Sequence, residues 1–361
     1  LTTTHAHSTP ETCNLRRLLD TPAAAPWLAV VIDQLASAAI MAFANRQPSR
    51  VKAGVGQVLG LSRNRRVIGP DGRILGGPET TPQAGQAKAG PLDPEVGVLL
   101  LEAIDSNACT VITNFACHPV TVQVQPLVSA DFPGPAMSFV EQSVPGCTNS
   151  LFLQGACGDI NPIRNTTDFA DVQRYGLMLG GEVLKTVMRL SAPDYPVSTP
   201  KLAVITETIF VAARELPPRA PAQQAYEAAT AELAGASTEA ERKQWRVRQR
   251  MAAETLLLIE RGAAPIAAEV QVIRLGDSAI VALPGEPFAQ LGITIKQRSA
   301  ARHTLVVGYA NDWIGYLTTP QAWQEGGYEV GPGPWTRVGP AGGEQLVDKA
   351  MALIQRLWQE E

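Results

Sequence analysis

The stretch from Val111 to Pro133 constrains the fold most, because it joins an apolar strand to residues that can do chemistry. It begins as a β-branched run, which is typical of a buried strand. The run then reaches Asn114, Cys117 and His118, and Pro119 follows at once. Because proline cannot donate to a strand ladder, we expect the strand to stop after His118 and its imidazole to face a cleft. A core histidine bonded to a backbone carbonyl is the alternative for this residue taken alone.

The size and charge of the chain exclude some classes of protein. Its 361 residues, 45% of them hydrophobic, are enough for one large domain or two closely joined ones. A net charge of -4 without any basic block argues against a nucleic-acid partner. We expect no transmembrane segment, because no apolar run approaches the length of a membrane span. The longest candidate, 27–44, contains Asp33, Gln34 and Ser37 and predicts an amphipathic helix.

The five cysteines do not form a disulfide framework, because their number is odd and their density is low. We therefore expect buried free thiols, which favours a reducing compartment such as the cytoplasm. The sequence shows no signal peptide, but it begins abruptly at Leu1. A leader removed before this point would instead indicate a periplasmic or secreted protein.

The first residues offer two imidazoles. Three threonines precede His5 and favour an extended backbone, which would turn His5 and His7 to the same face. A His-x-His pair of this kind suits a metal ion. The alternative is a disordered terminus that carries two solvated histidines.

Strands and helices alternate along the rest of the chain. We expect an α/β (α+β) fold in which mixed sheets, or two facing sheets, carry helices on their outer sides. The pattern predicts one domain over residues 1–361, with a helical hairpin inserted at about 213–265. Strands are expected at 50–61, 94–104, 108–116, 200–212 and 304–309, with a further strand from 149 and two strands within 267–282 that turn at Gly276-Asp277. Helices are expected at 21–46, 135–143, 168–190, 288–299 and 342–361.

The loop predicted at 62–91 contains Asn64, Arg65 and Arg66 in succession. A guanidinium offers a planar fork of donors, so this cluster is a candidate clamp for an anion or a carbonyl. We expect Arg66 itself to be a solvated loop charge.

A turn with two glycines follows the strand that begins at Asn149. We expect Gly155 and Gly158 to allow close backbone approach and positive φ, with N–H groups presented to an oxyanion. Asp159 and Asn161 would then lie on its rim; Asn161 capping the next helix is the alternative. Cys157 lacks an assigned base that would make it a nucleophile.

Two carboxylates lie where chain direction changes. Asp131 precedes a helix, so it is either a helix cap or an acceptor for the second N–H of a ligand histidine. Glu286 follows Pro-Gly at a strand end and needs a buried partner, either a metal or an arginine. Tyr316 and Tyr328 are site residues or simple packing.

These motifs, taken in order, resemble the neutral/alkaline, non-lysosomal ceramidase superfamily. The likeness runs from Leu1 to about Val330 and is carried by His5-x-His7, 114–119, 158–162, Gly285-Glu286 and 316–320. The resemblance implies a catalytic domain that hydrolyses an amide bond with one bound zinc. By motif, it implies that the metal ligands are His5, His118, Glu286 and Tyr316, that His7 lies near the reacting group, and that Asn64 and Arg65 are the Asn-Arg pair of the family loop.

The chain departs from the family pattern at three points. The family motif G-D-x-S-P supplies a serine, and this position is Asn161 here. The carboxy-terminal β-sandwich of ceramidases is missing, as are the strands before T-H-x-H. The resemblance therefore supports metal-assisted hydrolysis of a small-molecule or lipid-like amide more strongly than ceramide as the substrate.

The ligand types also indicate the chemistry directly. Two imidazoles, a carboxylate and a phenol suit Zn²⁺ with one position left for water, whose pKa the ion lowers. The expected catalytic residues are His7 for proton movement, Arg65 and the turn at Asp159 for the oxyanion, and Asn161 as a hydrogen-bond donor.

Other functions are left open. The chain is alternatively a metal- or ligand-binding homologue with altered catalysis, or an esterase or lactonase on the same site. A serine or cysteine hydrolase would lack the usual G-x-S-x-G elbow. Two alternatives for a partner are also open: a separate amino-terminal chain that completes the sheet before Leu1, and a homo-oligomer.

Overall fold

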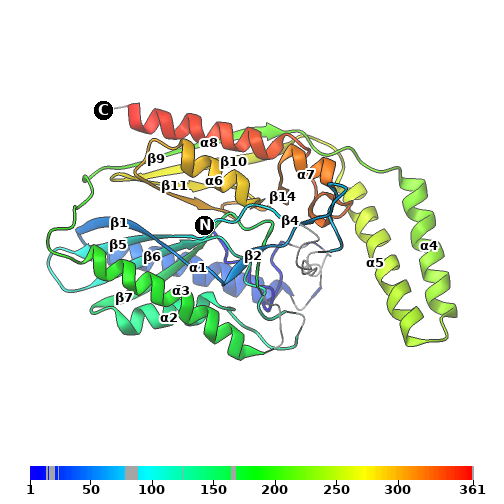
Figure 1. Ribbon diagram of the computed structural model, residues 1–361, viewed down its shortest axis with the longest axis horizontal. Coiled ribbons are helices and arrows are strands. Elements are labelled where there is room, and N and C mark those ends of the chain that lie inside the picture. The colour runs from blue at the N-terminus through cyan, green and yellow to red at the C-terminus, as the bar shows by residue number, and fades with distance from the viewer. Residues whose placement is uncertain are drawn as a thin grey trace.

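The computed structural model describes residues 1–13, 15, 21–22, 24–77, 88–123, 125–163 and 168–359. Its body has four layers: helices, a sheet, a second sheet and helices again (Figure 1). The expected α/β fold of mixed sheets with flanking helices is confirmed.

The first sheet has four strands in the order β1-β5-β6-β7. The neighbours β1 and β5, and β5 and β6, are antiparallel, whereas β6 and β7 are parallel. Helices α2 and α3 cover its outer face (Figure 1). The bounds are β1 Ser49–Gln57, β5 Glu95–Ala103, β6 Cys109–Phe115, β7 Cys147–Gln154, α2 Pro133–Ser143 and α3 Phe169–Leu190.

The second sheet has the order β13-β11-β10-β9, and only β11 and β13 pair in parallel. Helices α6 and α8 cover its outer face. The bounds are β9 Leu202–Val211, β10 Ile266–Leu275, β11 Ser278–Ala282, β13 His303–Val307, α6 Ala289–Arg298 and α8 Gly342–Gln359.

The continuous apolar run of β5 follows from this layering. Val98 and Leu100 lie in one core cluster with Leu179 of α3. Leu99 points the other way and packs with Leu305 of the second sheet. A strand buried on both faces needs apolar residues at every position, as in V-L-L-L.

Two of the three short ladders carry residues of the site. Glu286 pairs with Tyr316 in the ladder of β12 and β14, and Asn64 pairs with Ile160 in the ladder of β2 and β8. The region expected to be loop at 62–91 thus contains strands. The bounds are β2 Ser62–Asn64, β3 Val67–Ile68, β4 Lys88–Ala89, β8 Ile160–Pro162, β12 Glu286–Pro287, β14 Tyr316–Leu317, α7 Pro320–Glu325 and a 3-10 helix Tyr328–Val330.

The helical hairpin projects from the body, as Figure 1 shows. It consists of α4 (Arg219–Gly235) and α5 (Glu239–Arg261), and a capping box between Thr238 and Glu241 starts the second helix. Leu258, near the end of α5, is fully buried.

Helix α1 (Ala24–Ala44) corrects two expectations. None of its residues is buried, so it shows no amphipathic face packed on the core. Its 21 residues also make it long and apolar enough, by those two measures alone, to cross a membrane. Asp33 is the single charge in the helix and does not lower its hydropathy enough to change this result. Helices inside soluble proteins and signal sequences meet the same two measures.

Candidate metal centre

Three imidazoles and one carboxylate converge from three distant parts of the chain. The Nε2 atoms of His5 and His7 are 3.1 Å apart. Glu286 Oε2 lies 3.4 Å from His118 Nε2 and 3.7 Å from His5 Nε2. Ligand nitrogens of all three histidines lie within 4.8 Å of one another, a spacing that one metal ion can bridge.

His118 follows β6, and its imidazole is fixed by contacts with the backbone of Ile160. Its backbone N–H and its ring Nδ1 both lie 3.0 Å from the carbonyl oxygen of Ile160. A carbonyl only accepts, so Nδ1 carries the hydrogen and Nε2 carries the lone pair. That Nε2 is buried and makes no hydrogen bond. The carbonyl partner expected for a core histidine is therefore present, while Nε2 on the other side of the ring faces Glu286.

The amino-terminal segment is ordered, which rules out the alternative of a disordered terminus. Thr2 forms a β-bridge with Ala310. The backbone N–H of His7 donates to Pro119 O at 3.3 Å, next to His118. His5 itself adopts a left-handed backbone with φ of 63°, which turns its ring toward the cluster.

Glu286 lies on β12, where its backbone is in close contact with Gly158. A Cβ at Gly158 would lie 2.5 Å from Glu286 O, so only glycine allows this approach. Tyr309 OH donates to Oε2 at 3.2 Å, and Trp313 Nε1 donates to Oε1 at 3.0 Å. The sequence reasoning missed Tyr309 and Trp313; the aromatic residues in 309–313, just before Tyr316, were the signal that was available.

Burial sets the protonation states of the cluster. Desolvation lowers the pKa of His5 to about 4 and also lowers the pKa of the buried His118. His7 lies on the exposed side of the cluster, and desolvation among its neighbours together with the adjacent His5 lowers its pKa to about 3. Burial alone would raise the pKa of Glu286, but His5 and His118, which become charged as the pH falls, and the permanently charged Arg65 outweigh burial and hold this pKa below its ordinary value. Near pH 7 the site therefore offers neutral imidazoles around an ionised carboxylate, which is the state that metal binding requires.

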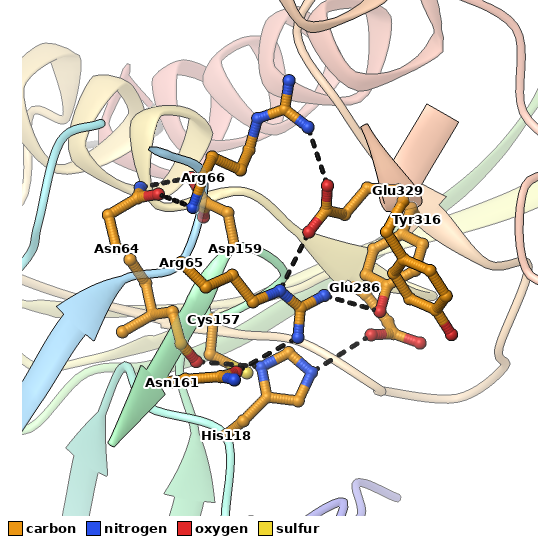
Figure 2. A network of polar contacts seen from close by, with 12 residues as sticks. Asn64, Arg65, Arg66, His118, Cys157, Asp159, Asn161, Glu286, Tyr316 and Glu329 are labelled. Atoms are coloured by element: carbon orange, nitrogen blue, oxygen red, sulfur yellow. Dashed lines mark hydrogen bonds and ion pairs between the residues drawn. The ribbon is translucent and has the colours of Figure 1, made fainter. Parts of the chain in front are cut away.

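Arg65 connects the remaining site residues (Figure 2). Its Nη2 donates to Tyr316 OH at 2.8 Å, and its Nη1 donates to Asn161 Oδ1 at 3.1 Å. Its Nε donates to Glu329 Oε1 at 2.8 Å. Desolvation raises the pKa of Tyr316 well above its ordinary value, although Arg65 opposes this effect. Tyr316 thus lies beside Glu286 in the β12–β14 ladder, with its hydroxyl bonded to Arg65.

Arg66 is buried, which corrects the expectation of a solvated charge. Its guanidinium pairs with Glu329 at 2.7 Å and with Glu325 at 3.1 Å. Glu329 thus joins Arg65 and Arg66 from the 3-10 helix. This partner is more than 260 residues away in the sequence, and no local pattern indicates it.

The glycine turn acts differently from the expectation. The N–H groups of Gly155 and Gly158 donate to Phe115 O and Pro287 O, so they are not presented to an oxyanion. Neither glycine has a positive φ, although the expected close backbone approach is present at both. Both N–H groups are used in backbone hydrogen bonds that join neighbouring segments of the chain.

Asp159 lies beside Asn64 and α6, away from His118 in Figure 2. Its Oδ1 accepts from Ala289 N at 2.8 Å, and its Oδ2 accepts from Asn64 Nδ2 at 2.7 Å. Burial raises the pKa of Asp159 to about 6. These contacts tie the turn to the start of α6, which is a scaffolding position.

The hydrogen-bond partners of Asp131 and Cys157 decide between the roles expected for them. Asp131 accepts from Val122 N and Phe132 N, so it is not the acceptor for His118, whose Nδ1 uses a carbonyl. The helix it precedes has no side-chain cap either. Cys157 Sγ lies 3.4 Å from Tyr309 OH, and burial raises the pKa of this thiol. Cys157 is therefore protonated, which does not suit a nucleophile.

Fold and site together define a mixed α/β protein with a candidate metal centre where two sheets meet. No family model matches the chain. It is 34% identical to the neutral ceramidase of Pseudomonas aeruginosa over 104 residues, which cover 26% of this chain and 15% of that protein. It is 35% identical to the neutral ceramidase of Mycobacterium tuberculosis over 68 residues, 17% of this chain and 11% of that protein.

Solved structures agree in fold. The crystal structure of the Pseudomonas aeruginosa neutral ceramidase matches with a TM-score of 0.58 at 20% identity, over 86% of this chain and 53% of the other. A ceramidase complexed with C2 matches with a TM-score of 0.56 at 17% identity, over 86% and 54%. The chain spans about half the length of these relatives. The chain is thus similar to neutral ceramidases over short stretches of sequence, as the motifs indicated, and it shares the fold of their solved structures.

Proposed function

We propose that the chain is a zinc-dependent hydrolase that cleaves an amide (N-acyl) bond with activated water. The observation that carries this proposal is the convergence of His5, His118 and Glu286, in which the buried Nε2 of His118 has no hydrogen-bond partner. A buried nitrogen lone pair without a donor is costly unless something else occupies it.

The donor set fits a zinc ion. Imidazole nitrogens and a carboxylate oxygen are ligands that zinc commonly takes in proteins. His5, His118 and Glu286 would hold the ion, with Tyr316 as the fourth protein ligand. Bound there, zinc would lower the pKa of a water molecule and polarise a carbonyl group.

Arg65 supports catalysis by orienting its neighbours. Its three hydrogen bonds fix Tyr316 and Asn161, while Glu329 holds the guanidinium from behind. The delocalised positive charge would stabilise the oxyanion that develops when water attacks the carbonyl carbon. Asn161 cannot act as a covalent nucleophile, so attack by water is the route that these residues favour.

His7 is the candidate for proton movement. It adjoins His5 on the exposed side of the cluster and is neutral near pH 7, because desolvation among its neighbours and the adjacent His5 lower its pKa to about 3. With so low a pKa His7 is a weak base in the free protein, so its role would be to relay the proton from the attacking water to the leaving amine as the oxyanion charge develops beside it.

Among the aromatic rings next to Tyr316, that of Tyr328 is 36% exposed and would offer an apolar face to a substrate. Tyr328 stacks on Trp335 with centroids 4.8 Å apart and meets Tyr316 edge-on at 6.1 Å. The relatives are named as ceramidases, so the proposed substrate class is a small-molecule or lipid-like N-acyl amide. Asn161, which replaces the family serine, is the feature that favours a second candidate, a homologue that binds a metal or ligand without amide hydrolysis.

A panel of substrates tests the proposal. N-acyl amino acids, short amides and matched esters are incubated with wild type, His118→Ala and the control His303→Ala, whose histidine lies on β13. We expect wild type and His303→Ala to hydrolyse an amide, a chelator to abolish this activity and zinc to restore it. Metal binding without hydrolysis of any amide or ester would favour the second candidate.

A further inference from the structure

The segment of residues 308–313 contacts both the amino-terminal chain that carries His5 and the side chain of Glu286. Thr2 is bridged to Ala310, and Thr2 Oγ1 donates to Gly308 O at 2.9 Å. Asn311 N donates to Leu1 O at 2.7 Å. This segment therefore anchors the extended chain that carries His5.

The same segment holds Glu286. Tyr309 OH donates to Oε2 and Trp313 Nε1 donates to Oε1, so each carboxylate oxygen has its own donor. The Tyr309 ring also stacks on His5, with centroids 4.3 Å apart and planes inclined by 19°. One side chain thus contacts two of the proposed ligands.

The backbone of the segment is strained in a way that serves this placement. Tyr309 has φ of 53° and Asn311 has φ of 65°, both in the left-handed region that is unfavourable for residues other than glycine. Hydrogen bonds from Tyr309 N to Gly285 O and from Ala310 N to Leu283 O lock it to the strand end before Glu286.

We propose that Tyr309 and Trp313 are positioning residues that fix the Glu286 carboxylate for metal binding, an inference that rests on the proposed function. Trp313 holds Oε1, which leaves Oε2 turned toward the Nε2 atoms of His5 and His118. A freely rotating carboxylate would not keep Oε2 in this direction, and it would lose more conformational entropy when it binds the metal. Hydrogen-bond partners of metal ligands typically contribute about 10- to 100-fold to metal affinity.

Simple packing does not account for the two donors. The half-buried ring of Trp313 packs against both hydrophobic cores, but packing does not decide where its N–H points, and this N–H is aimed at a carboxylate whose side chain is 4% exposed. Tyr309 keeps its stacking on His5 without its hydroxyl. The substitutions Tyr309→Phe and Trp313→Phe therefore remove the donors and retain aromatic rings.

The test measures zinc affinity by competition with a chromophoric chelator, and the visible absorption of bound Co²⁺, for both variants. The matched controls are Tyr195→Phe, whose hydroxyl donates to Ala53 O, and Trp323→Phe, whose N–H donates to Thr318. We expect each site variant to bind zinc about 10-fold or more weakly and to change the Co²⁺ spectrum. The controls should match wild type, and the thermal stability of all four variants should be compared without metal.

The outcomes separate the two levels of inference. If wild type binds no zinc, the proposed function fails together with this inference. If wild type binds zinc and both site variants bind it equally tightly with an unchanged Co²⁺ spectrum, only the positioning role is overturned. Weaker binding that merely follows a loss of metal-free stability, and occurs equally in the controls, would also overturn it.

Discussion

The orientation of single side chains at this site is set by their hydrogen-bond partners. His118 has its Nδ1–H committed to Ile160 O, so its lone pair points at Glu286. Arg65 has donors for three different partners, and all are buried with it. Such residues leave little room for substitution, because each lost contact strands a partner in a low-dielectric interior.

Arg65→Lys should be far from conservative. An ammonium group keeps the charge but cannot donate in a fork to Glu329, Asn161 and Tyr316 together. We expect a loss of unfolding free energy on the order of 3 kcal/mol, measured by urea denaturation, and at least a tenfold loss of hydrolysis. The control Arg298→Lys, in an exposed pair with Asp348, should change stability by less than about 1 kcal/mol. Equal effects in both variants would contradict this role.

Glu329 predicts a specific dependence on pH. Burial alone would raise its pKa, but Arg65 and Arg66 outweigh this and lower it. A carboxyl whose folded pKa is lowered contributes stability that is complete above its unfolded pKa of about 4.5 and is lost as pH falls through the folded value. Urea unfolding from pH 6 to 3 should therefore show a smaller acid-induced loss for Glu329→Gln than for wild type. The exposed Glu239→Gln is the control, and parallel curves for Glu329→Gln would contradict the prediction.

At the scale of elements, short ladders at the ends of the long strands bring the site residues together. The ladders β12–β14 and β2–β8 are only two or three residues long, yet they bring Glu286 beside Tyr316 and Arg63 beside Asn161. The long strands of both sheets supply the rigid frame. Close contacts at glycines then set how near these short ladders approach one another.

Gly158→Ala tests this approach. The new Cβ would lie 2.5 Å from Glu286 O and 3.1 Å from Pro287 O, which are backbone atoms that cannot swing away. We expect a loss of about 1 to 3 kcal/mol in unfolding free energy and weaker metal binding. Gly181→Ala is the control, because its Cβ would meet open space on helix α3, and it should gain about 0.5 to 1 kcal/mol. Equal stability of the two variants would contradict the tight packing of β12.

Elements were predictable from the sequence where a periodic pattern was long. The hairpin of β5 and β6, the helical hairpin and the final helix follow from local pattern and turn residues. The clustering of His5 with His118 was expected through family motifs. The roles of Arg66, Asp131 and the glycine turn were mistaken, because each is decided by a partner that is distant in the sequence or by backbone hydrogen bonds that leave no pattern.

At the scale of the whole molecule, the site is a junction between the two sheets and their loops. His118 follows the first sheet, Glu286 follows the second, and the amino-terminal segment bridges to Ala310. An ion held by these residues would cross-link parts of the chain that are more than 160 residues apart. Metal binding should therefore stabilise the molecule as a whole and not one loop alone.

Thermal unfolding measures this linkage. A ligand at 100 times its dissociation constant stabilises the folded state by roughly 2.7 kcal/mol if it does not bind the unfolded chain. We expect zinc to raise the melting temperature of wild type and His303→Ala, and a chelator to reverse the rise. His118→Ala should show no such shift. An identical shift in His118→Ala would mean that zinc binds elsewhere.

The metal content of the purified protein tests the central claim most directly. Elemental analysis of wild type, His118→Ala and the control His303→Ala, after equilibration with zinc and removal of free metal, gives the number of ions per chain. We predict one zinc per chain in wild type and in His303→Ala, and none in His118→Ala. Wild type without stoichiometric metal, or His118→Ala that retains it, would contradict a metal centre built from His5, His118 and Glu286.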